Sequence, residues 1–287
     1  MRSRLSLFTV FNGVLLSGIV FITLYPFWYM AIISLSQDIY VMKGQVLWLP
    51  KGFNLDMYKF VLSDPRILTG YTNTVLYTII GTLLSLIITS LGAYALSKRE
   101  MPFRKSFTLI IIFTMFFNGG MIPTFLVVKS YGLMDTLWGM VLPAAVSTWN
   151  LLIMRTFFSA IPVELEESGK LEGLTEAGVF FKIVLPLSKA IFATIGLFYA
   201  VAMWNNFMLP LLYLRDPDLF PLQIVLRNIV LAGQLNSSDA TSVGDGVIVE
   251  ESLKYATIMA ATVPILLVYP FLQKYFVKGA LVGAVKG

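Results

Sequence analysis

The chain of 287 residues is 57% hydrophobic and only 13% charged, about half the charged fraction of a typical soluble domain. It has no cysteine and no histidine, which excludes disulfides, thiolate chemistry, the usual zinc ligands and any serine–histidine triad. The net charge of +5 comes from short basic clusters beside apolar segments, a pattern that favours a membrane protein over a nucleic-acid-binding one.

The first apolar run covers about residues 7–33 and follows Arg2 and Arg4. A secretory signal peptide also begins with basic residues, but its apolar region is shorter and ends at a small-residue cleavage site, which is not evident here. We therefore predict a retained membrane helix.

Further apolar runs of about 19 residues or more predict membrane helices. They lie near residues 73–96, 107–128, 137–157, 187–212 and 253–275. The predicted fold class is all-α: a single polytopic domain over residues 1–287 with six transmembrane helices.

Six crossings place both termini on one side of the membrane. The short segments on that side hold Arg2, Arg4, Lys98, Arg99, Arg104, Lys105, Lys170, Lys182, Lys189, Lys274, Lys278 and Lys286. The positive-inside rule then makes that side the cytoplasm. The longer segments of about residues 34–72 and 213–252 contain Asp64-Pro65 and Asp216-Pro217, which are turn signals, so we predict that they are outer loops.

The polar segment of about residues 159–189 lies between the fourth and fifth predicted spans and is the main candidate for function. Pro162 suits the first position of a helix. Glu164, Glu166 and Glu167 follow in the opening turns, where carboxylates interact favourably with the helix dipole. A short helix is predicted to begin here.

A second helix is predicted after a turn in the same segment. Gly169 and Gly173 either end the first helix or let another backbone approach closely, and Thr175 is a suitable N-cap for the next helix. Pro186 then interrupts the chain near the fifth span.

The two short helices carry more apolar side chains than a solvated loop should expose, and such a surface usually docks onto another protein. These side chains are Leu165, Leu171, Leu174, Val179, Phe180 and Phe181. The alternative is a helical hairpin that packs only against its own bundle.

The strings Glu167-Ser168-Gly169, Gly173 and Ile183-Val184-Leu185-Pro186 resemble the EAA loop of ABC importer permeases. The usual form of that loop is Glu-Ala-Ala, a glycine four positions after the last alanine, and a hydrophobic-x-Leu-Pro ending. Ser168 and Gly169 replace the alanines by other small residues, and Glu172 stands where aspartate is common. Glycine at position 169 lowers helix propensity by up to about 1 kcal/mol relative to alanine.

Strings on both sides of the loop resemble the carbohydrate-uptake branch of these permeases, and the resemblance covers nearly the whole chain. Amino-acid and phosphate permeases share the loop, so the sugar assignment depends on these flanking strings. They are Asn73-Thr74, Gly92-Ala93-Tyr94-Ala95-Leu96, Met121-Ile122-Pro123, Tyr131-Gly132-Leu133 with Thr136, Trp204-Asn205-Asn206-Phe207 with Pro210, and the tail of residues 273–287.

The resemblance implies the type I ABC importer permease fold with a cytoplasmic coupling-helix loop, in a multi-pass protein of a bacterial cell membrane. It implies the permease subunit of an ATP-driven, binding-protein-dependent importer of sugars or oligosaccharides. The expected partners are a second homologous permease, two ATPase subunits, a periplasmic or extracellular sugar-binding protein and membrane lipid, with no nucleic acid.

The chain itself is expected to be a translocation subunit and not an enzyme. It has no G-x-x-x-x-G-K-[ST] string to hold nucleotide phosphates. No metal or cofactor is expected in this chain, and ATP with magnesium is expected on the partner ATPase.

The resemblance also implies which residues couple to the ATPase, with residues 164–178 forming the coupling helices. Glu167 would cap or pair with the ATPase surface, and Gly169 and Gly173 would permit close backbone contact. The full set is Glu164, Glu167, Ser168, Gly169, Gly173, Leu185 and Pro186.

Sugars present apolar C–H faces and many hydroxyl groups, so a sugar path favours aromatic rings beside amides and hydroxyls. Polar amides within a membrane are costly unless they are paired or face a cavity. The candidates are Trp149, Asn150, Tyr199, Trp204, Asn205 and Asn206. The alternative is structural, because asparagines often bridge membrane helices and aromatic rings often only pack.

Arg155, near the inner end of the fourth span, would either bind a substrate carboxylate or extend to the lipid head groups, and we favour the second role. The alternative function is an ion-coupled secondary transporter. Such proteins usually carry carboxylates within the membrane, and no Asp or Glu lies near the middle of a predicted span.

Overall fold

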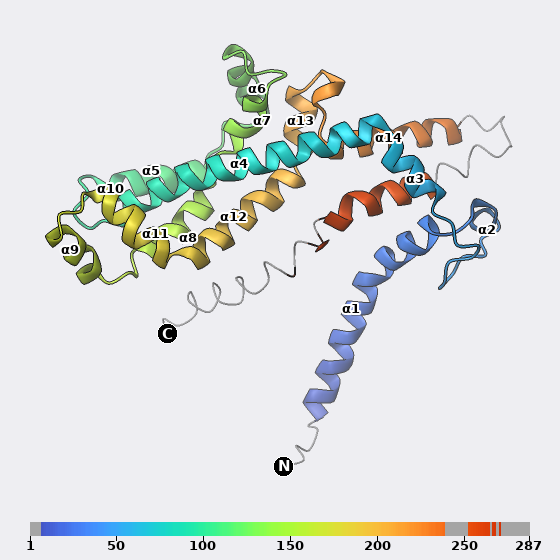
Figure 1. Ribbon diagram of the computed structural model, residues 1–287, viewed down its shortest axis with the longest axis horizontal. Helices are drawn as coiled ribbons and strands as arrows, with labels where there is room; N and C mark the ends of the chain where they lie inside the picture. Colours follow the sequence, from blue (N-terminus) through green and yellow to red (C-terminus); the bar gives the residue numbers. More distant parts are fainter. Residues whose placement is uncertain (1–6, 239–251, 265, 268–269, 271–287) are drawn as a thin grey trace. The chain divides into compact units, whose positions relative to one another are not determined.

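The computed structural model describes residues 7–238, 252–264, 266–267 and 270, and all the regular elements in this part of the chain are helices (Figure 1). This confirms the predicted all-α class. The chain divides into two compact units, each described here by itself. Unit 1 comprises the described parts of Met1–Leu68 and Val225–Pro264, and unit 2 those of Thr69–Ile224 and Ile265–Gly287.

Unit 1 begins with the predicted first membrane helix, α1 (Leu7–Ser34). Its most apolar stretch has no buried residue, and only its last three residues are buried, against α2 (Asp38–Met42) and its surroundings. An apolar helix that is exposed all around has the surface of a membrane span. Residues 252–264, where the sixth predicted span begins, are also helical. Its remainder to residue 275 lies largely outside the described residues.

The predicted outer loop of residues 34–72 is more ordered than the sequence indicated. It contains α2, α3 (Asp56–Ser63) and the start of α4 (Pro65–Ser97). Its irregular part is fixed to α1 and to the residue that follows it, because Trp28 Nε1 donates to the Trp48 carbonyl at 3.0 Å and Asn54 N donates to the Leu35 carbonyl at 2.9 Å.

The second span begins eight residues before the predicted position 73, and the reason lies in Asp64-Pro65. This pair was interpreted as a turn, but Asp64 Oδ1 accepts a hydrogen bond from Arg66 N at 2.9 Å and Pro65 is the first helical residue. An N-capping aspartate followed by proline is a helix start.

Unit 2 contains the other spans and the candidate site. After α4, its helices are α5 (Arg104–Phe116), α6 (Met121–Ser130), α7 (Leu137–Val141), η1 (Leu142–Ala144), α8 (Thr148–Phe158), α9 (Val163–Leu171), α10 (Glu176–Val179), the π-helical η2 (Phe180–Val184), α11 (Leu185–Leu187), α12 (Lys189–Trp204), α13 (Met208–Tyr213) and η3 (Pro217–Leu219), and α14 (Leu222–Ser238) continues into unit 1.

Three spans predicted as continuous helices are broken. The third bends by 112° between α5 and α6 and the fourth by 57° between η1 and α8, whereas the fifth stops at Trp204 and resumes at Met208. In the third span, Gly120 has φ +88° and its N–H donates to Asn118 Oδ1 at 2.7 Å, which is a turn that glycine allows.

The predicted second outer loop of residues 213–252 is also partly helical, because it contains η3 and all of α14. Residues of α4 hold its beginning. Asn73 Nδ2 donates to the Asp218 carbonyl at 2.8 Å, Tyr77 OH donates to the Leu219 carbonyl at 2.9 Å, and Thr74 Oγ1 accepts from Leu222 N at 2.8 Å. Residues 239–251 of this predicted loop lie outside the described part.

The main core of unit 2 joins α4, α8, α10, η2 and α12 at the end where α9 to α11 lie (Figure 1). Its buried residues are Ala93, Tyr94, Met154, Phe158, Val179, Phe180, Val184, Ile191, Ile195 and Tyr199. Because the segment after α10 contributes side chains to this core, the polar segment of residues 159–189 is fixed to the ends of three long helices.

Candidate functional site

Residues 163–179 form α9, a turn and α10, which we call the hairpin. Pro162 directly precedes α9 rather than taking its first position. The N–H of Leu174 donates to the Gly169 carbonyl and that of Gly173 to the Lys170 carbonyl, both at 3.0 Å. With φ +85° at Gly173, this is a Schellman motif, so Gly173 ends the first helix. A Cβ atom at Gly173 would meet nothing within 4 Å.

Gly169 has a different role from Gly173. It is buried, and a Cβ atom there would lie 2.5 Å from Ile183 Cδ1 and 3.3 Å from Leu174 Cδ1. The absence of a side chain therefore lets α9 approach η2 closely. This is the close packing that the sequence offered as one of two roles for the glycines.

The second helix begins as predicted, because Thr175 Oγ1 accepts a hydrogen bond from Gly178 N at 3.2 Å. Leu185 is half-buried against the core, and Pro186 is exposed within α11. Proline has no N–H to donate to a preceding turn, and the chain bends by 84° at Ser188, between α11 and α12.

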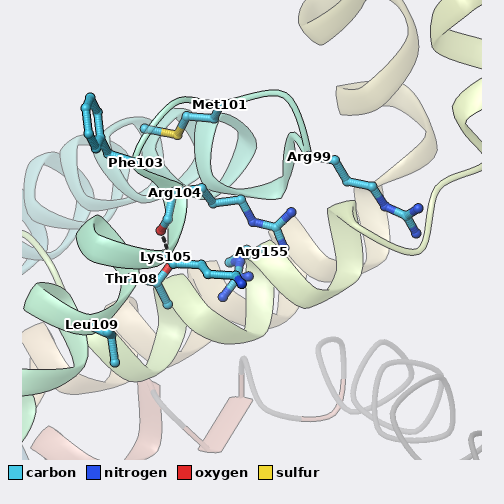
Figure 2. Close-up of a pocket in the computed structure, with 8 residues that line it drawn as sticks. All are labelled: Arg99, Met101, Phe103, Arg104, Lys105, Thr108, Leu109 and Arg155. Atoms are coloured by element: carbon cyan, nitrogen blue, oxygen red, sulfur yellow. Dashed lines mark hydrogen bonds between the residues drawn. The ribbon is translucent and has the colours of Figure 1, made fainter.

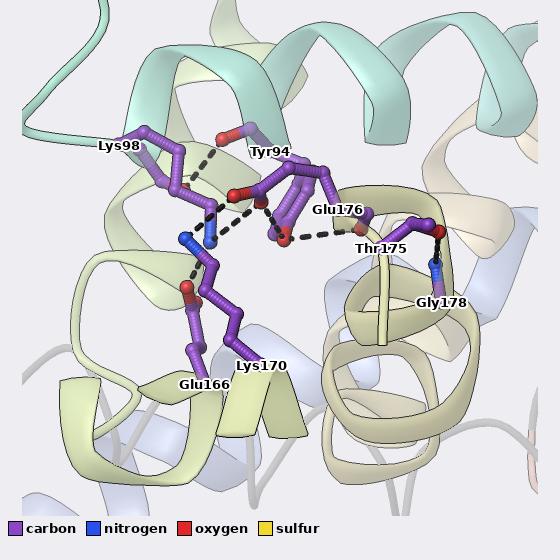
Figure 3. Close-up of polar contacts among 8 residues, drawn as sticks. Tyr94, Lys98, Glu166, Lys170, Thr175, Glu176 and Gly178 are labelled. Carbon is purple, nitrogen blue, oxygen red and sulfur yellow. Dashed lines mark hydrogen bonds and ion pairs between the residues drawn. The ribbon is translucent and has the colours of Figure 1, made fainter. Parts of the chain in front are cut away.

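The hairpin is tied to the end of α4 by a group that we call the polar cluster: Tyr94, Lys98, Glu166, Lys170 and Glu176 (Figure 3). Lys98 Nζ pairs with Glu166 and lies 3.8 Å from Glu176 Oε2, while Lys170 Nζ lies 2.5 Å from Glu176 Oε1. Tyr94 OH donates to Glu176 Oε2 at 3.2 Å. Both helices of the hairpin are therefore linked to α4 and to each other.

Charges within the polar cluster favour the ionised forms of Lys170 and Glu176. The hydrogen bond from Lys170 holds the pKa of Glu176 below its ordinary value, and the same bond raises the pKa of Lys170. Burial lowers the pKa of Lys98, while the nearby Glu176 acts in the opposite direction.

The opposite face of α9 is free of such contacts. Glu164, Glu167, Ser168 and Leu171 are spaced i, i+3, i+4 and i+7 and therefore share one face. All four are exposed, Leu171 by 90%. Neither glutamate forms an ion pair with any residue that the structure describes. We call these four residues the outer face of α9.

The apolar surface of the hairpin region is smaller than the sequence predicted. Val179 and Phe180 are buried in the core, and Leu174 is half-buried. Leu165, Leu171 and Phe181 remain exposed, by 44%, 90% and 60%. The helices thus pack against their own bundle on one side and keep an apolar part of their surface exposed on the other.

Tyr199, predicted for the sugar path, is buried and bridges three segments. Its hydroxyl shares a hydrogen bond of 2.7 Å with Thr89 Oγ1 of α4 and accepts another of 3.0 Å from Ser147 N, at the start of α8. Trp149 and Asn150 follow in the first turn of α8, with Trp149 60% exposed and Asn150 buried.

The other three path candidates lie at the break between α12 and α13. Trp204 is the last residue of α12 and is half-buried. Asn205 Nδ2 donates to the Val201 carbonyl at 2.9 Å, and Asn206 Oδ1 accepts from Leu209 N at 3.2 Å. The Asn206 side chain therefore caps the start of α13, whereas the Val201 carbonyl accepts from both the backbone N–H and the side-chain amide of Asn205.

The polar cluster is what sequence reasoning missed. Lys98 and Lys170 were interpreted only as topology signals, Glu166 only as a helix-dipole residue, and Tyr94 only as part of a family string. Lys98 and Glu166 are 68 positions apart, so no local pattern joins them. Within the described residues, no group of three or more potential metal-ligating side chains is present.

Residues 90–282, which include the hairpin and the polar cluster, match the family described as binding-protein-dependent transport system inner membrane component. Protein LplC of Bacillus subtilis is 45% identical over 280 residues, covering 98% of this chain and 95% of LplC. The polygalacturonan/rhamnogalacturonan transport system permease protein YtcP of the same species is 43% identical, with 100% of both chains covered.

A solved structure is also similar to this chain. It is a crystal structure of a bacterial ABC transporter involved in the import of the acidic polysaccharide alginate. One of its chains is 35% identical and has a TM-score of 0.88, covering 96% of this chain and 98% of its own length.

Proposed function

This chain belongs to the family of binding-protein-dependent transport system inner membrane components, and we propose that the outer face of α9 is where it engages an ATPase. It is a multi-pass permease subunit of an ABC importer for sugars. As a translocation component it is not an enzyme, since ATP hydrolysis belongs to a separate subunit. Membership of this family gives no support to the alternative of an ion-coupled secondary transporter.

Importers of this class combine permease, ATPase and binding-protein components. For this chain, the proposed assembly contains one related but different permease, two ATPase subunits that hold ATP and magnesium, and an external sugar-binding protein. The hairpin would face the cytoplasm, with both chain termini on the same side.

The single observation that carries the ATPase contact is the outer face of α9. Two carboxylates that form no ion pair with any described residue lie on the same face as a 90% exposed leucine, on a helix whose other face is fixed to the end of α4. Apolar side chains exposed on a rigid element are typical of a docking surface. Glu164, Glu167 and Ser168 would set the orientation, and Leu171 would supply an apolar contact.

Gly173 would be the point of closest backbone approach. A Cβ atom at Gly173 would meet no described residue within 4 Å, so an ATPase surface can reach the turn there. Leu185 and Pro186 would act differently, by shaping the bend that leads into α12. Movement of the hairpin by the ATPase would then be transmitted to α4 through the polar cluster and to α12 through this bend. The hairpin would act as a rigid lever.

The test of this proposal is Gly173→Asn in the full importer complex. Asparagine adopts positive φ more readily than other residues that carry a Cβ atom, so the Schellman turn should persist while its side chain fills the space left for the ATPase. We expect normal membrane insertion and a loss of about tenfold or more in binding-protein-stimulated ATPase activity, the equivalent of about 1.4 kcal/mol of coupling.

Gly44→Asn is the matched control, because Gly44 also has positive φ (+60°) and open space beyond it but lies in unit 1. It should leave ATPase stimulation unchanged. Full stimulation in the Gly173→Asn complex would exclude a close ATPase contact at the turn.

For the substrate, the proposed contacts are Trp149, Asn150, Trp204, Asn205 and Asn206, with Tyr199 holding the adjacent helix ends in place. The relatives named for polygalacturonan or rhamnogalacturonan and for arabino-oligosaccharides support an oligosaccharide. Trp149→Ala should raise the concentration of oligosaccharide-loaded binding protein needed for transport, or lower its maximal rate, without reducing ATPase assembly. Unchanged transport kinetics would remove Trp149 from the path.

A further inference from the structure

A cavity of about 720 Å³ lies where the connection after α4, the first turns of α5 and the last turns of α8 meet. Its lining includes the cations Arg99, Arg104, Lys105 and Arg155, with Phe103 and Leu109 among its apolar residues. Figure 2 shows the charged ends of Arg104, Lys105 and Arg155 gathered together, with Arg99 at one side.

These four positive charges are not neutralised by the described part of the chain. No carboxylate there forms an ion pair with any of them, and no acidic residue lines the cavity. Glu100, between two of the lining residues, acts instead on Lys98 and Lys170. Arg155 uses Nε to donate to the Leu96 carbonyl at 3.1 Å. Like charges around one cavity repel each other unless an anion separates them.

An apolar groove continues from this basic cavity along α5. It is a shallow, open groove of about 490 Å³, lined by Leu109, Ile110, Ile112, Phe113, Phe116 and Phe117. Leu109 lines both spaces. The distance along α5 from Arg104 to Phe116 is about 18 Å at 1.5 Å per residue, comparable with half of the roughly 30 Å hydrocarbon core of a bilayer.

We infer that the cavity and the groove together bind one anionic phospholipid, with its phosphate among the basic side chains and an acyl chain along α5. A soluble phosphate or an acidic oligosaccharide would use the cations but would gain nothing from an apolar groove that runs about 11 Å along α5, from Leu109 to Phe116. A phospholipid matches both the basic cavity and the apolar groove, and it also matches their order along α5. Only the placement of this lipid in the cytoplasmic leaflet rests on the proposed function, in which the hairpin faces the cytoplasm.

The test is native mass spectrometry of the complete importer complex in mixed phosphatidylglycerol and phosphatidylcholine nanodiscs. We expect retained phosphatidylglycerol in the unaltered complex. Because Arg104→Gln/Lys105→Gln removes two of the four cations, its apparent affinity should fall by about 30-fold. Lys43→Gln/Lys51→Gln, which removes two exposed cations of unit 1, is the charge-matched control and should retain the lipid.

Two further arms separate the possible ligands. Phe113→Ala should weaken retention of phosphatidylglycerol, and neither millimolar inorganic phosphate nor trigalacturonate should displace the lipid. Equal retention of both lipids, no effect of Arg104→Gln/Lys105→Gln, or displacement by phosphate or trigalacturonate would overturn the inference. ATPase stimulation measured in the same samples reports the proposed function separately, since the hairpin is intact in every variant.

Discussion

At the scale of single residues, two glycines in the hairpin look equivalent in the sequence but have different structural roles. Gly173 supplies a positive φ with open space beyond it, whereas Gly169 supplies a missing side chain between α9 and η2. The sequence indicated that these positions were special, but it could not assign the roles. The positive φ of Gly173 and the contact of Gly169 with Ile183 distinguish the two roles, and neither can be read from the sequence.

Gly169→Ala should change the thermal stability of the purified complex by about 1 kcal/mol or less, because the gain in helix propensity offsets a small shift of the Ile183 methyl end. Gly169→Leu should instead displace α9 and lower binding-protein-stimulated ATPase activity by tenfold or more, an estimated cost of about 1–3 kcal/mol for overpacking. Equal behaviour of the two variants in thermal unfolding and ATPase assays would contradict this explanation of the glycine.

Tyr199 gives a second prediction at this scale. Tyr199→Phe leaves Thr89 Oγ1 and Ser147 N without their hydrogen-bond partner, and buried polar groups left unpaired cost about 1–3 kcal/mol each. A lower melting temperature is therefore expected, measured by thermal unfolding in detergent. The control is Tyr131→Phe, at a 76% exposed ring. An equal fall in melting temperature in Tyr199→Phe and Tyr131→Phe would mean that the hydrogen bonds of Tyr199 contribute nothing to stability.

At the scale of helices, sequence patterns predicted the beginning and end of local elements better than their continuity. The Thr175 cap and the helix–turn–helix order follow from residues within a few positions of each other. The breaks in the third, fourth and fifth spans were not predicted, because a window of about 19 residues stays apolar on average even when it contains a short polar string such as Asn118-Gly119-Gly120 or Asn205-Asn206. Composition records which residues tolerate lipid, whereas a break depends on one or two backbone angles such as that of Gly120.

The polar cluster makes α4 and the hairpin one mechanical element, and its central ion pair can be tested by a double-mutant cycle. Lys98 and Glu166 have side chains only 22% and 15% exposed. Removing one partner leaves a partly buried charge, which costs about 3 kcal/mol or less, while removing both should cost less than the sum. We expect Lys98→Met and Glu166→Gln each to reduce thermal stability and the double variant to recover part of it. Strict additivity would exclude a direct interaction.

At the scale of the whole molecule, the family and the all-α fold were predictable from sequence, whereas the polar cluster and the lipid cavity were not. The family strings are local and ordered along the chain. The cavity and the cluster join residues from segments that only the fold brings together, such as Arg104 with Arg155 and Lys98 with Glu166. The assignment of residues 1–287 to a single domain stays a prediction.

Orientation in the membrane is also a prediction, and the absence of cysteine makes it simple to test. Single cysteines at exposed positions 63 and 106 (Ser63→Cys and Ser106→Cys) lie at opposite ends of α4 and its connection to α5. In intact cells, a membrane-impermeant maleimide should label only position 63, and both should react after permeabilisation. Labelling of position 106 alone in intact cells would invert the topology.

The hairpin is closed mainly by contacts between near neighbours in the chain. Gly169 meets Leu174, and Lys170 meets Glu176. Contacts of such short sequence separation form early in folding, and chains fold from the N-terminal side during synthesis. The hairpin can therefore close as it leaves the ribosome, and α4, with Tyr94 and Lys98, is already made. If the outer face of α9 is the ATPase contact, as proposed, this surface is complete before the fifth span enters the membrane, and assembly with the ATPase can begin on an unfinished chain.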